Sequence, residues 1–274
     1  MTTALPGCKS LLLRADGSVL HATINRPESR NALSQEVVEE LDGVAAALET
    51  SLDFRVLVLR GAGGTFCAGG DIKGFMEALA ADAPANPKDD PVAKNNRRYG
   101  DLLLRLNGLP QTLIAVVEGA AFGGGLGLIC ISDIAICMAS AKFALSETGL
   151  GIPPAQIAPF VVQRIGLTAT RNIALSGARF KGGFAKELGL VHHLAEDEAA
   201  LEARLAQVLT DISKCAPYAN AATKQILMES LHRPVGAVLD DAAAAFAKQL
   251  RGPEGQEGVI AFVEKRSPYW VERF

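Results

Sequence analysis

Short apolar runs that end in glycine-rich turns place the strongest constraint on how this chain can fold. Residues 55–60 and 113–117 are rich in aliphatic side chains, and each run stops at a glycine turn. Such runs are typical of buried strands in a parallel sheet. A glycine-rich segment at 123–127 then opens an apolar stretch of helical length, and residues 133–138 resume as a strand. The chain therefore repeats strand, turn and helix, and we predict an α/β fold.

The N-terminal part follows the same plan. Residues 19–25 alternate between apolar and polar side chains, which predicts a strand that enters a turn at 26–29. Ser34 is a candidate N-cap, because a serine hydroxyl accepts a hydrogen bond from a free N–H of the first helical turn. Apolar residues then recur at helical spacing from Val37 to Leu48, so we predict one amphipathic helix there.

Residues 75–98 break this repeat. The segment carries Pro84, Pro87 and Pro91 within a polar stretch. Because proline interrupts strands and helix interiors, we expect a mobile surface loop or lid without regular structure.

The composition changes again after about residue 195. Alanine, leucine, glutamate and lysine dominate, with helical spacing over 199–212, 219–231 and 236–250. We therefore predict a core domain over residues 1–198 and a helical C-terminal subdomain over residues 199–274.

Charge and length exclude several classes of protein. The 274 residues include 27 Lys and Arg against 30 Asp and Glu, which gives a formal net charge of −3. A chain without a broad positive field lacks the usual attraction for phosphate backbones, so we expect no nucleic-acid partner. The four histidines form no ligand pattern, and His192 and His193 are expected at a strand end rather than at a metal.

Features of secreted and membrane proteins are also missing from the sequence. The most apolar region is interrupted by Glu118 and Asp133, so we expect no membrane span. The five cysteines show no CxxC pair, and they are expected to be reduced thiols. The N-terminus has neither a basic start nor an apolar stretch, and we expect a cytoplasmic protein.

Two glycine turns are candidates for chemistry, at residues 66–73 and 121–127. Each follows a predicted strand and precedes a predicted helix, where backbone N–H groups lack partners. If the turns converge, two N–H groups would form an oxyanion hole for a substrate carbonyl. Alternatively, both are tight turns that need glycine for a positive φ. Nucleotide loops are excluded, since neither turn matches GxGxxG in register and GxxxxGK[ST] is absent.

Glu147 is the carboxylate with the most unusual surroundings. It follows an apolar strand and precedes a loop rich in glycine and proline. Burial would raise its pKa and suit it to proton transfer near neutral pH. A structural role such as capping is the alternative.

Taken together, several blocks of this chain resemble one family. They are Asn25-Arg-Pro with Arg30-Asn-Ala-Leu33, FCAGGDIK at 66–73, VEGAAFGGG at 117–125, Ser132-Asp-Ile, Phe143 to Glu147, and Phe262-Val-Glu-Lys-Arg266. In this order they are similar to the crotonase, or enoyl-CoA hydratase/isomerase, family, over nearly the whole chain.

The resemblance implies a fold and a ligand. The fold would be a crotonase-like spiral of ββα repeats, and the helical C-terminal subdomain would assemble homotrimers or dimers of trimers. The substrate would be an acyl-CoA thioester, so no separate cofactor is needed because coenzyme A is part of the substrate.

The resemblance also assigns site residues by their place in the blocks. Gly70 and Gly124 match the family's oxyanion-hole residues, and Glu147 matches a catalytic glutamate. The remaining assignments concern coenzyme A: Ala68, Gly70, Asp71, Ile72, Lys73 and Gly124 along the bound molecule, Arg30 near its adenine, and Lys265 at its phosphates.

Gly127 departs from the family pattern. Hydratases of the family carry a second glutamate at this place, and its absence raises the prospect of double-bond isomerisation by Glu147 alone. Residues 146–162, however, resemble hydratases of 3-branched glutaconyl-CoA esters, such as the methylglutaconyl type. The GGGLGL segment at 123–128 is similar to hydratases of the isohexenylglutaconyl type. We therefore favour a 2-enoyl-CoA hydratase, in which the substrate's own carboxylate or ordered water covers the missing group. An isomerase and a non-catalytic acyl-CoA-binding homologue remain the alternatives.

Overall fold

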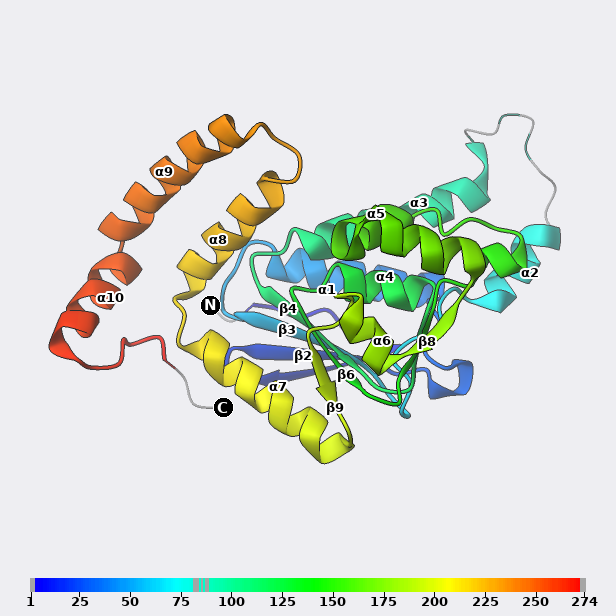
Figure 1. Ribbon diagram of the computed structural model, residues 1–274, viewed down its shortest axis with the longest axis horizontal. Helices are drawn as coiled ribbons and strands as arrows, with labels where there is room; N and C mark the ends of the chain where they lie inside the picture. The colour runs from blue at the N-terminus through cyan, green and yellow to red at the C-terminus, as the bar shows by residue number, and fades with distance from the viewer. Residues whose placement is uncertain (1–2, 81–83, 85, 87–88, 272–274) are drawn as a thin grey trace.

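The computed structural model describes residues 3–80, 84, 86 and 89–271, and its centre is a six-stranded sheet (Figure 1). The strand order is β1-β2-β3-β4-β6-β9; β1 is antiparallel to β2 and all other pairs are parallel. The strands are β1 (Leu11–Asp16), β2 (Val19–Ile24), β3 (Val56–Gly61), β4 (Thr112–Val117), β6 (Ile134–Met138) and β9 (His193–Ala195). Four of them fall where the sequence predicted strands, at β2, β3, β4 and β6.

A second, three-stranded sheet takes the order β5-β7-β8. Its strands are β5 (Ala120–Phe122), β7 (Lys142–Ala144) and β8 (Arg179–Lys181). The chain alternates between the sheets: β4 joins the large sheet, β5 joins the small one, and α4 (Gly124–Cys130) follows. The same order of elements recurs with β6, β7 and α5 (Ala158–Ser176). These ββα repeats confirm the predicted α/β fold.

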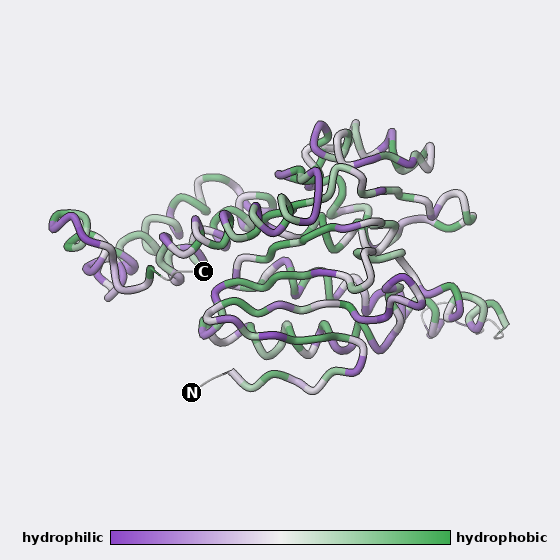
Figure 2. Tube along the Cα trace, turned by 90° about the horizontal axis from the view of Figure 1, so that it is seen from below, coloured by the Kyte–Doolittle hydropathy of each residue, from purple (hydrophilic) through white to green (hydrophobic). Residues whose placement is uncertain are grey.

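Helices cover both faces of the large sheet. On one face, the core is built from α1 (Gln35–Leu48), α3 (Pro91–Asn107), α4 and α5, with Phe66 and Phe143 among its largest buried side chains. On the other face, α7 (Glu198–Ser213) packs leucines against valine and isoleucine side chains of the strands. The strands are hydrophobic along most of their length (Figure 2), as expected for a sheet that is covered on both sides.

The segment that was expected to be a lid is largely helical, so that expectation was wrong for its described residues. Helix α2 (Ile72–Ala80) and helix α3 cover both ends of residues 75–98. Pro91 does not break α3 but opens it, because the first helical position has no intrahelical N–H bond to lose. The Asp90 carboxylate caps the helix, accepting from the Val92 N–H at 2.8 Å. Residues 81–83, 85 and 87–88, which the same expectation included, lie outside the described residues.

The C-terminal helices form an arm that extends from the body (Figure 1). After α6 (Gly182–Glu187) and α7 come α8 (Pro217–Glu229), α9 (Val235–Arg251) and α10 (Pro253–Glu264), which confirms the predicted helices at 199–212, 219–231 and 236–250. Since α7 packs on the sheet, only α8 to α10 leave the body, and the domain boundary at residue 198 stays a prediction.

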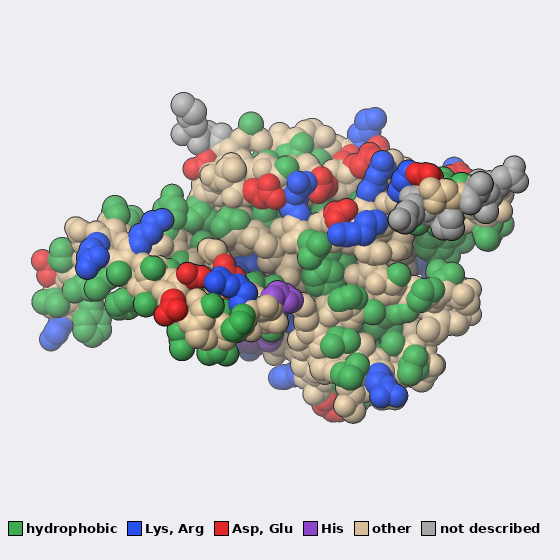
Figure 3. All heavy atoms as spheres, turned by 90° about the horizontal axis from the view of Figure 1, so that it is seen from above, with side chains coloured by type: hydrophobic (Ala, Val, Ile, Leu, Met, Phe, Trp, Pro, Cys, Tyr) green, Lys and Arg blue, Asp and Glu red, His purple; other side chains and the backbone are tan. Residues whose placement is uncertain are grey.

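Apolar side chains are exposed along the arm (Figure 3). Phe246 is 69% exposed and Phe262 is 85% exposed, and Val235, Leu239, Val259 and Val263 are also exposed. None of the helices in the described part of the chain, the arm included, is long and apolar enough to cross a bilayer.

Candidate active site

The register between successive repeats brings the two glycine turns to one edge of the small sheet. Cys67 forms a parallel bridge with Ala121, and Ala121 in turn pairs with Phe143. Gly70 and Gly124 each follow their bridge residue by three positions. The two turns therefore lie side by side, as the oxyanion-hole hypothesis requires.

Close packing explains the glycines within these turns. Gly69 has φ +95° and Gly123 has φ +49°, values that residues with a side chain rarely adopt. A Cβ on Gly69 would also lie only 2.9 Å from the Phe122 carbonyl oxygen. The alternative explanation, a tight turn with positive φ, thus applies to Gly69 and Gly123.

Gly70 and Gly124 differ from these neighbours, because neither has a positive φ. Because they have no side chain, the side chains of Phe75 and Leu33 can pack closely against them. A Cβ on Gly70 would lie 2.6 Å from the Phe75 ring, and one on Gly124 would lie 2.6 Å from Leu33 Cδ1. Within the described residues, neither of their N–H groups donates a hydrogen bond, whereas the Gly123 N–H donates to the Ala144 carbonyl. Two donors are thus available at one place.

Glu147 lies against the second turn. It begins the short helix η3 (Glu147–Leu150), and its Oε1 would be 2.8 Å from a Cβ built on Gly123. Its Oε2 is buried and has no hydrogen-bond partner among the described residues. Burial raises the pKa of Glu147, and backbone N–H groups of Ser146 and of Glu147 itself offset part of this effect. The carboxylate is therefore a proton acceptor of raised basicity beside two free N–H groups.

Gly127 lies on α4 with no room for a side chain. A Cβ there would lie 2.4 Å from Ile157 Cγ2 and 3.3 Å from the Tyr99 hydroxyl oxygen. Tyr99 comes from α3, and its hydroxyl donates to the Gly124 carbonyl at 2.5 Å. The sequence interpretation did not include Tyr99, which follows the expected lid and carries no motif of its own.

The residues assigned to coenzyme A form one surface, with one exception. The Ala68 N–H donates to the Arg30 carbonyl at 3.0 Å, so these two lie together. Asp71 leads into α2, where Ile72 and Lys73 are exposed. Lys265, in contrast, caps α10, which lies at the opposite end of the molecule from α2 (Figure 1). Within one chain, Lys265 does not meet the other site residues.

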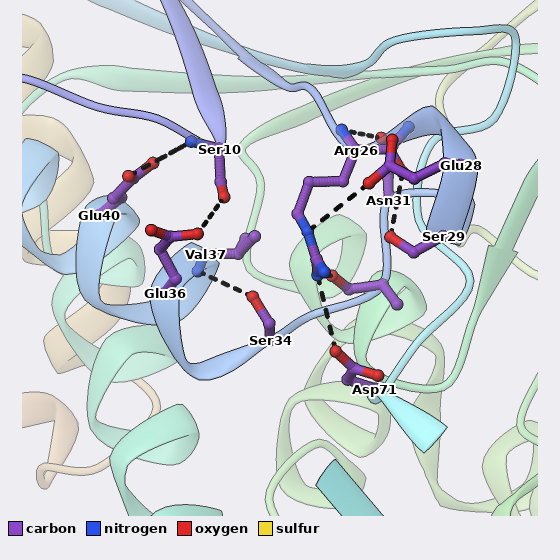
Figure 4. Close-up of polar contacts among 11 residues, drawn as sticks. Ser10, Arg26, Glu28, Ser29, Asn31, Ser34, Glu36, Val37, Glu40 and Asp71 are labelled. Atoms are coloured by element: carbon purple, nitrogen blue, oxygen red, sulfur yellow. Dashed lines mark hydrogen bonds and ion pairs between the residues drawn. The ribbon is translucent and has the colours of Figure 1, made fainter. Parts of the chain in front are cut away.

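Two further residues hold this surface in place, and the sequence interpretation gave them no separate role. The Asn31 side chain donates to the Ala62 and Thr65 carbonyls at 2.8 and 2.6 Å and accepts from the Arg26 N–H (Figure 4). The Arg26 guanidinium lies 3.6 Å from the Asp71 carboxylate. The buried asparagine thus fixes the loop before Cys67, and Arg26 joins the N-terminal turn to the first glycine turn.

Comparisons with known proteins agree on one family. The family model for enoyl-CoA hydratase/isomerase matches residues 14–273. The solved structure of Pseudomonas aeruginosa AtuE is 52% identical with a TM-score of 0.93, and the match covers 96% of this chain and 100% of that one. Enoyl-CoA hydratase EchA19 of Mycobacterium tuberculosis is 32% identical over 100% of both chains. The peroxisomal Delta(3,5)-Delta(2,4)-dienoyl-CoA isomerase of Arabidopsis thaliana is 30% identical over 94% of both chains.

Proposed function

Because this chain belongs to the enoyl-CoA hydratase/isomerase family, we propose that it hydrates the 2,3 double bond of a branched or carboxylated 2-enoyl-CoA thioester. The N–H groups of Gly70 and Gly124 would hold the thioester oxygen, and Glu147 would be the base. Arg30, Ala68, Asp71, Ile72 and Lys73 would line the coenzyme A. The assignment of Lys265 to its phosphates would require another subunit.

In the proposed reaction one carboxylate moves one proton. Glu147 removes a proton from water while the water oxygen bonds to C3. The π electrons of the C2–C3 bond shift toward the thioester, and the enolate oxygen accepts hydrogen bonds from both glycine N–H groups. Glu147 then returns the proton to C2, so water has added to one face and the carboxylate is regenerated.

The observation that carries this proposal is the unpartnered Oε2 of Glu147. A buried carboxylate oxygen without a hydrogen bond is costly for a folded protein, and such groups concentrate at functional sites. A capping role would have provided the oxygen with an N–H partner. The free N–H groups of Gly70 and Gly124 could stabilise the negative charge that develops on the thioester oxygen.

A cationic side chain near η3 supports a carboxylated substrate. Arg179 lines a cavity of about 460 Å³ together with Ser146 and Thr148, the two sequence neighbours of Glu147, while Glu147 itself is not part of the lining. The Arg179 guanidinium lies 5.7 Å from the centre of the Phe122 ring, next to the second glycine turn. A guanidinium at this position would bind a second carboxylate of the substrate.

Isomerisation is the second candidate, because position 127 offers no carboxylate. Glu147 alone could move a proton between C2 and C4 through an enolate held by the same two N–H groups, and one relative is named a dienoyl-CoA isomerase. A third possibility is a homologue that binds acyl-CoA without catalysis. The intact Glu147 and both glycine turns argue against it.

Product masses separate these three functions. The purified protein would be incubated with crotonyl-CoA, 3-methylglutaconyl-CoA, isohexenylglutaconyl-CoA and a 3-enoyl-CoA. We expect a gain of one water, confined to the carboxylated esters. An unchanged mass with a shifted double bond would establish the isomerase, and esters that bind without reacting would establish the non-catalytic homologue.

The exposed apolar side chains of the arm support assembly as part of the proposal. Apolar patches of this extent on a protein surface mark interaction sites. We propose that a second copy of the chain covers them, in a homotrimer or in a dimer of trimers.

A further inference from the structure

The hydroxyl of Tyr99 stands in the space that a side chain at position 127 would enter. It lies 3.3 Å from a Cβ built on Gly127 and 3.4 Å from one built on Gly124. Ile157 Cγ2 closes the same space from the other side, 2.4 Å from the Cβ position at 127. The place where related hydratases carry a glutamate is therefore filled, and the polar atom that fills it belongs to Tyr99.

Tyr99 is held in this position from two elements. Gly100, the next residue of α3, has no side chain, and a Cβ there would lie 2.1 Å from Gln156 Oε1. The Gln156 amide also donates to Asn96 of α3 at 2.9 Å, so the segment that contains Ile157 is tied to α3. The close approach of this segment to α3 thus presses Tyr99 and Ile157 together against α4.

The Tyr99 hydroxyl oxygen can still accept a hydrogen bond. A phenol has one proton, and Tyr99 donates it to the Gly124 carbonyl at 2.5 Å. Its lone pairs then remain for a proton from another molecule. Burial holds the pKa of Tyr99 well above its usual value, with smaller contributions from Cys67, Cys130 and Glu147, so the hydroxyl stays neutral and cannot serve as the base.

We propose that Tyr99 is the positioning residue for the attacking water, in place of the glutamate that is absent at position 127. This inference rests on the proposed hydration. The water would donate one proton to the Tyr99 oxygen in a hydrogen bond and its other proton to Glu147, which removes it as the oxygen bonds to C3. Tyr99 itself exchanges no proton in this step.

A test must separate water positioning from a structural effect on the oxyanion turn, since Tyr99 also contacts Gly124. Hydration of 3-methylglutaconyl-CoA needs the water, Glu147 and the turn. Exchange of the C2 hydrogens of saturated 3-methylglutaryl-CoA with deuterated water needs Glu147 and the turn, but no water held for attack on C3. The two rates would be measured in the parent, in Tyr99→Phe and in Glu147→Gln.

We expect Tyr99→Phe to lower kcat for hydration by about 10- to 100-fold, as the loss of a hydrogen bond in the transition state predicts. Its exchange rate should stay within about threefold of the parent, and the acidic limb of its pH profile should not move, because Glu147 remains the base. Glu147→Gln should lose both activities. Tyr218→Phe removes an exposed hydroxyl on α8 and is the matched control, with both rates unchanged.

Two results would overturn the inference while leaving hydration established. If Tyr99→Phe lowers hydration and exchange equally, Tyr99 acts only through the Gly124 turn. If it hydrates as fast as the parent, its hydroxyl has no role in the reaction. A parent that exchanges or isomerises but never hydrates would instead refute the proposed function, and the water-positioning role with it.

Discussion

Glu147 is a carboxylate whose ionised form is poorly compensated by its surroundings. One oxygen is buried without a partner, and burial is the largest cause of its raised pKa. A group that is kept charged at a cost to stability is typical of functional sites. The same cost makes a prediction about folding that is independent of any substrate.

Glu147→Gln should not destabilise the protein at neutral pH and should raise its melting temperature slightly. A raised folded-state pKa means that ionisation opposes folding, so the cost is absent below the unfolded pKa and grows as the pH rises through the folded pKa. The gain should therefore be present at pH 8 and vanish near pH 4. Thermal unfolding of both proteins at the two pH values measures it, and a clear loss of stability at pH 8 would show that Glu147 has a structural partner.

Gly127 should tolerate no side chain unless Ile157 changes as well. Gly127→Ala places a Cβ 2.4 Å from Ile157 Cγ2, and overpacking of this kind costs about 1 to 3 kcal/mol. Ile157→Leu removes that methyl group. In chemical denaturation the double variant should be more stable than the sum of the single effects predicts. Additive effects would mean that the two side chains do not meet.

The same geometry bears on restoring the absent glutamate. Gly127→Glu meets Ile157 and Tyr99 before its carboxylate can reach the site. We therefore expect that this substitution alone gives no gain in turnover on uncarboxylated enoyl-CoA.

At the scale of elements, the sequence predicted those strands and helices whose burial pattern is visible in their own residues. The strands β3 and β4 are buried on both faces, and α1 buries one stripe behind the Ser34 cap, so each carries its signal within a few residues. Helices α2 and α3 were missed within residues 75–98 because Pro84, Pro87 and Pro91 were taken to break any helix there. None of these prolines lies in α2, and Pro91 is the first residue of α3.

Contacts between distant elements could not be predicted from the chain. The two glycine turns are recognisable in sequence, but their convergence depends on the bridge between Cys67 and Ala121. Tyr99 reaches Gly124 because the fold brings α3 to the start of α4, and no local pattern near Tyr99 indicates this contact.

Arg55 should be essential for the junction between the body and the C-terminal helices. It is 7% exposed, and its guanidinium donates to the carbonyls of Cys215 and Trp270 at 2.5 and 2.7 Å, at the end of α7 and near the C-terminus. A cation at a helix C-terminus is stabilising. Arg55→Leu leaves these carbonyls without their donor and should cost about 2 to 4 kcal/mol in free energy of unfolding.

Chemical denaturation would measure this cost, with Arg14→Ala as the control. Arg14 is exposed, and among the described residues its guanidinium forms an ion pair with Asp16 alone, so its loss should cost less than about 0.5 kcal/mol. A cost for Arg55→Leu as small as that of the control would contradict the role of Arg55.

At the scale of the whole molecule, the site is a product of stacking. The β4–β5–α4 and β6–β7–α5 repeats each contribute a strand to the small sheet. The bridge between Cys67 and β5 adds the first glycine turn to the same edge of that sheet. The proposed chemistry is therefore spread over residues far apart in sequence, from Gly70 to Glu147. The arm takes no part in this stacking.

The exposed side chains of the arm should control assembly. We expect the parent to be a trimer or hexamer in size-exclusion chromatography with light scattering. Phe246→Glu combined with Phe262→Glu should yield a smaller species, because buried glutamates without partners oppose association. Leu12→Glu, on the exposed side of edge strand β1, is the matched control and should leave the assembly intact. A parent that is monomeric would contradict the assembly proposal.

The central claim is the proposed addition of water to an enoyl-CoA by Glu147, with the Gly70 and Gly124 N–H groups as the oxyanion hole. The most direct measurement is the reaction of 3-methylglutaconyl-CoA in deuterated water, with the parent and with Glu147→Gln, followed by mass and position analysis of the product. The account predicts a hydroxyl at C3 and one deuterium at C2 with the parent, and at least about 100-fold less product with Glu147→Gln at unchanged ester affinity. A Glu147→Gln variant as active as the parent would contradict it.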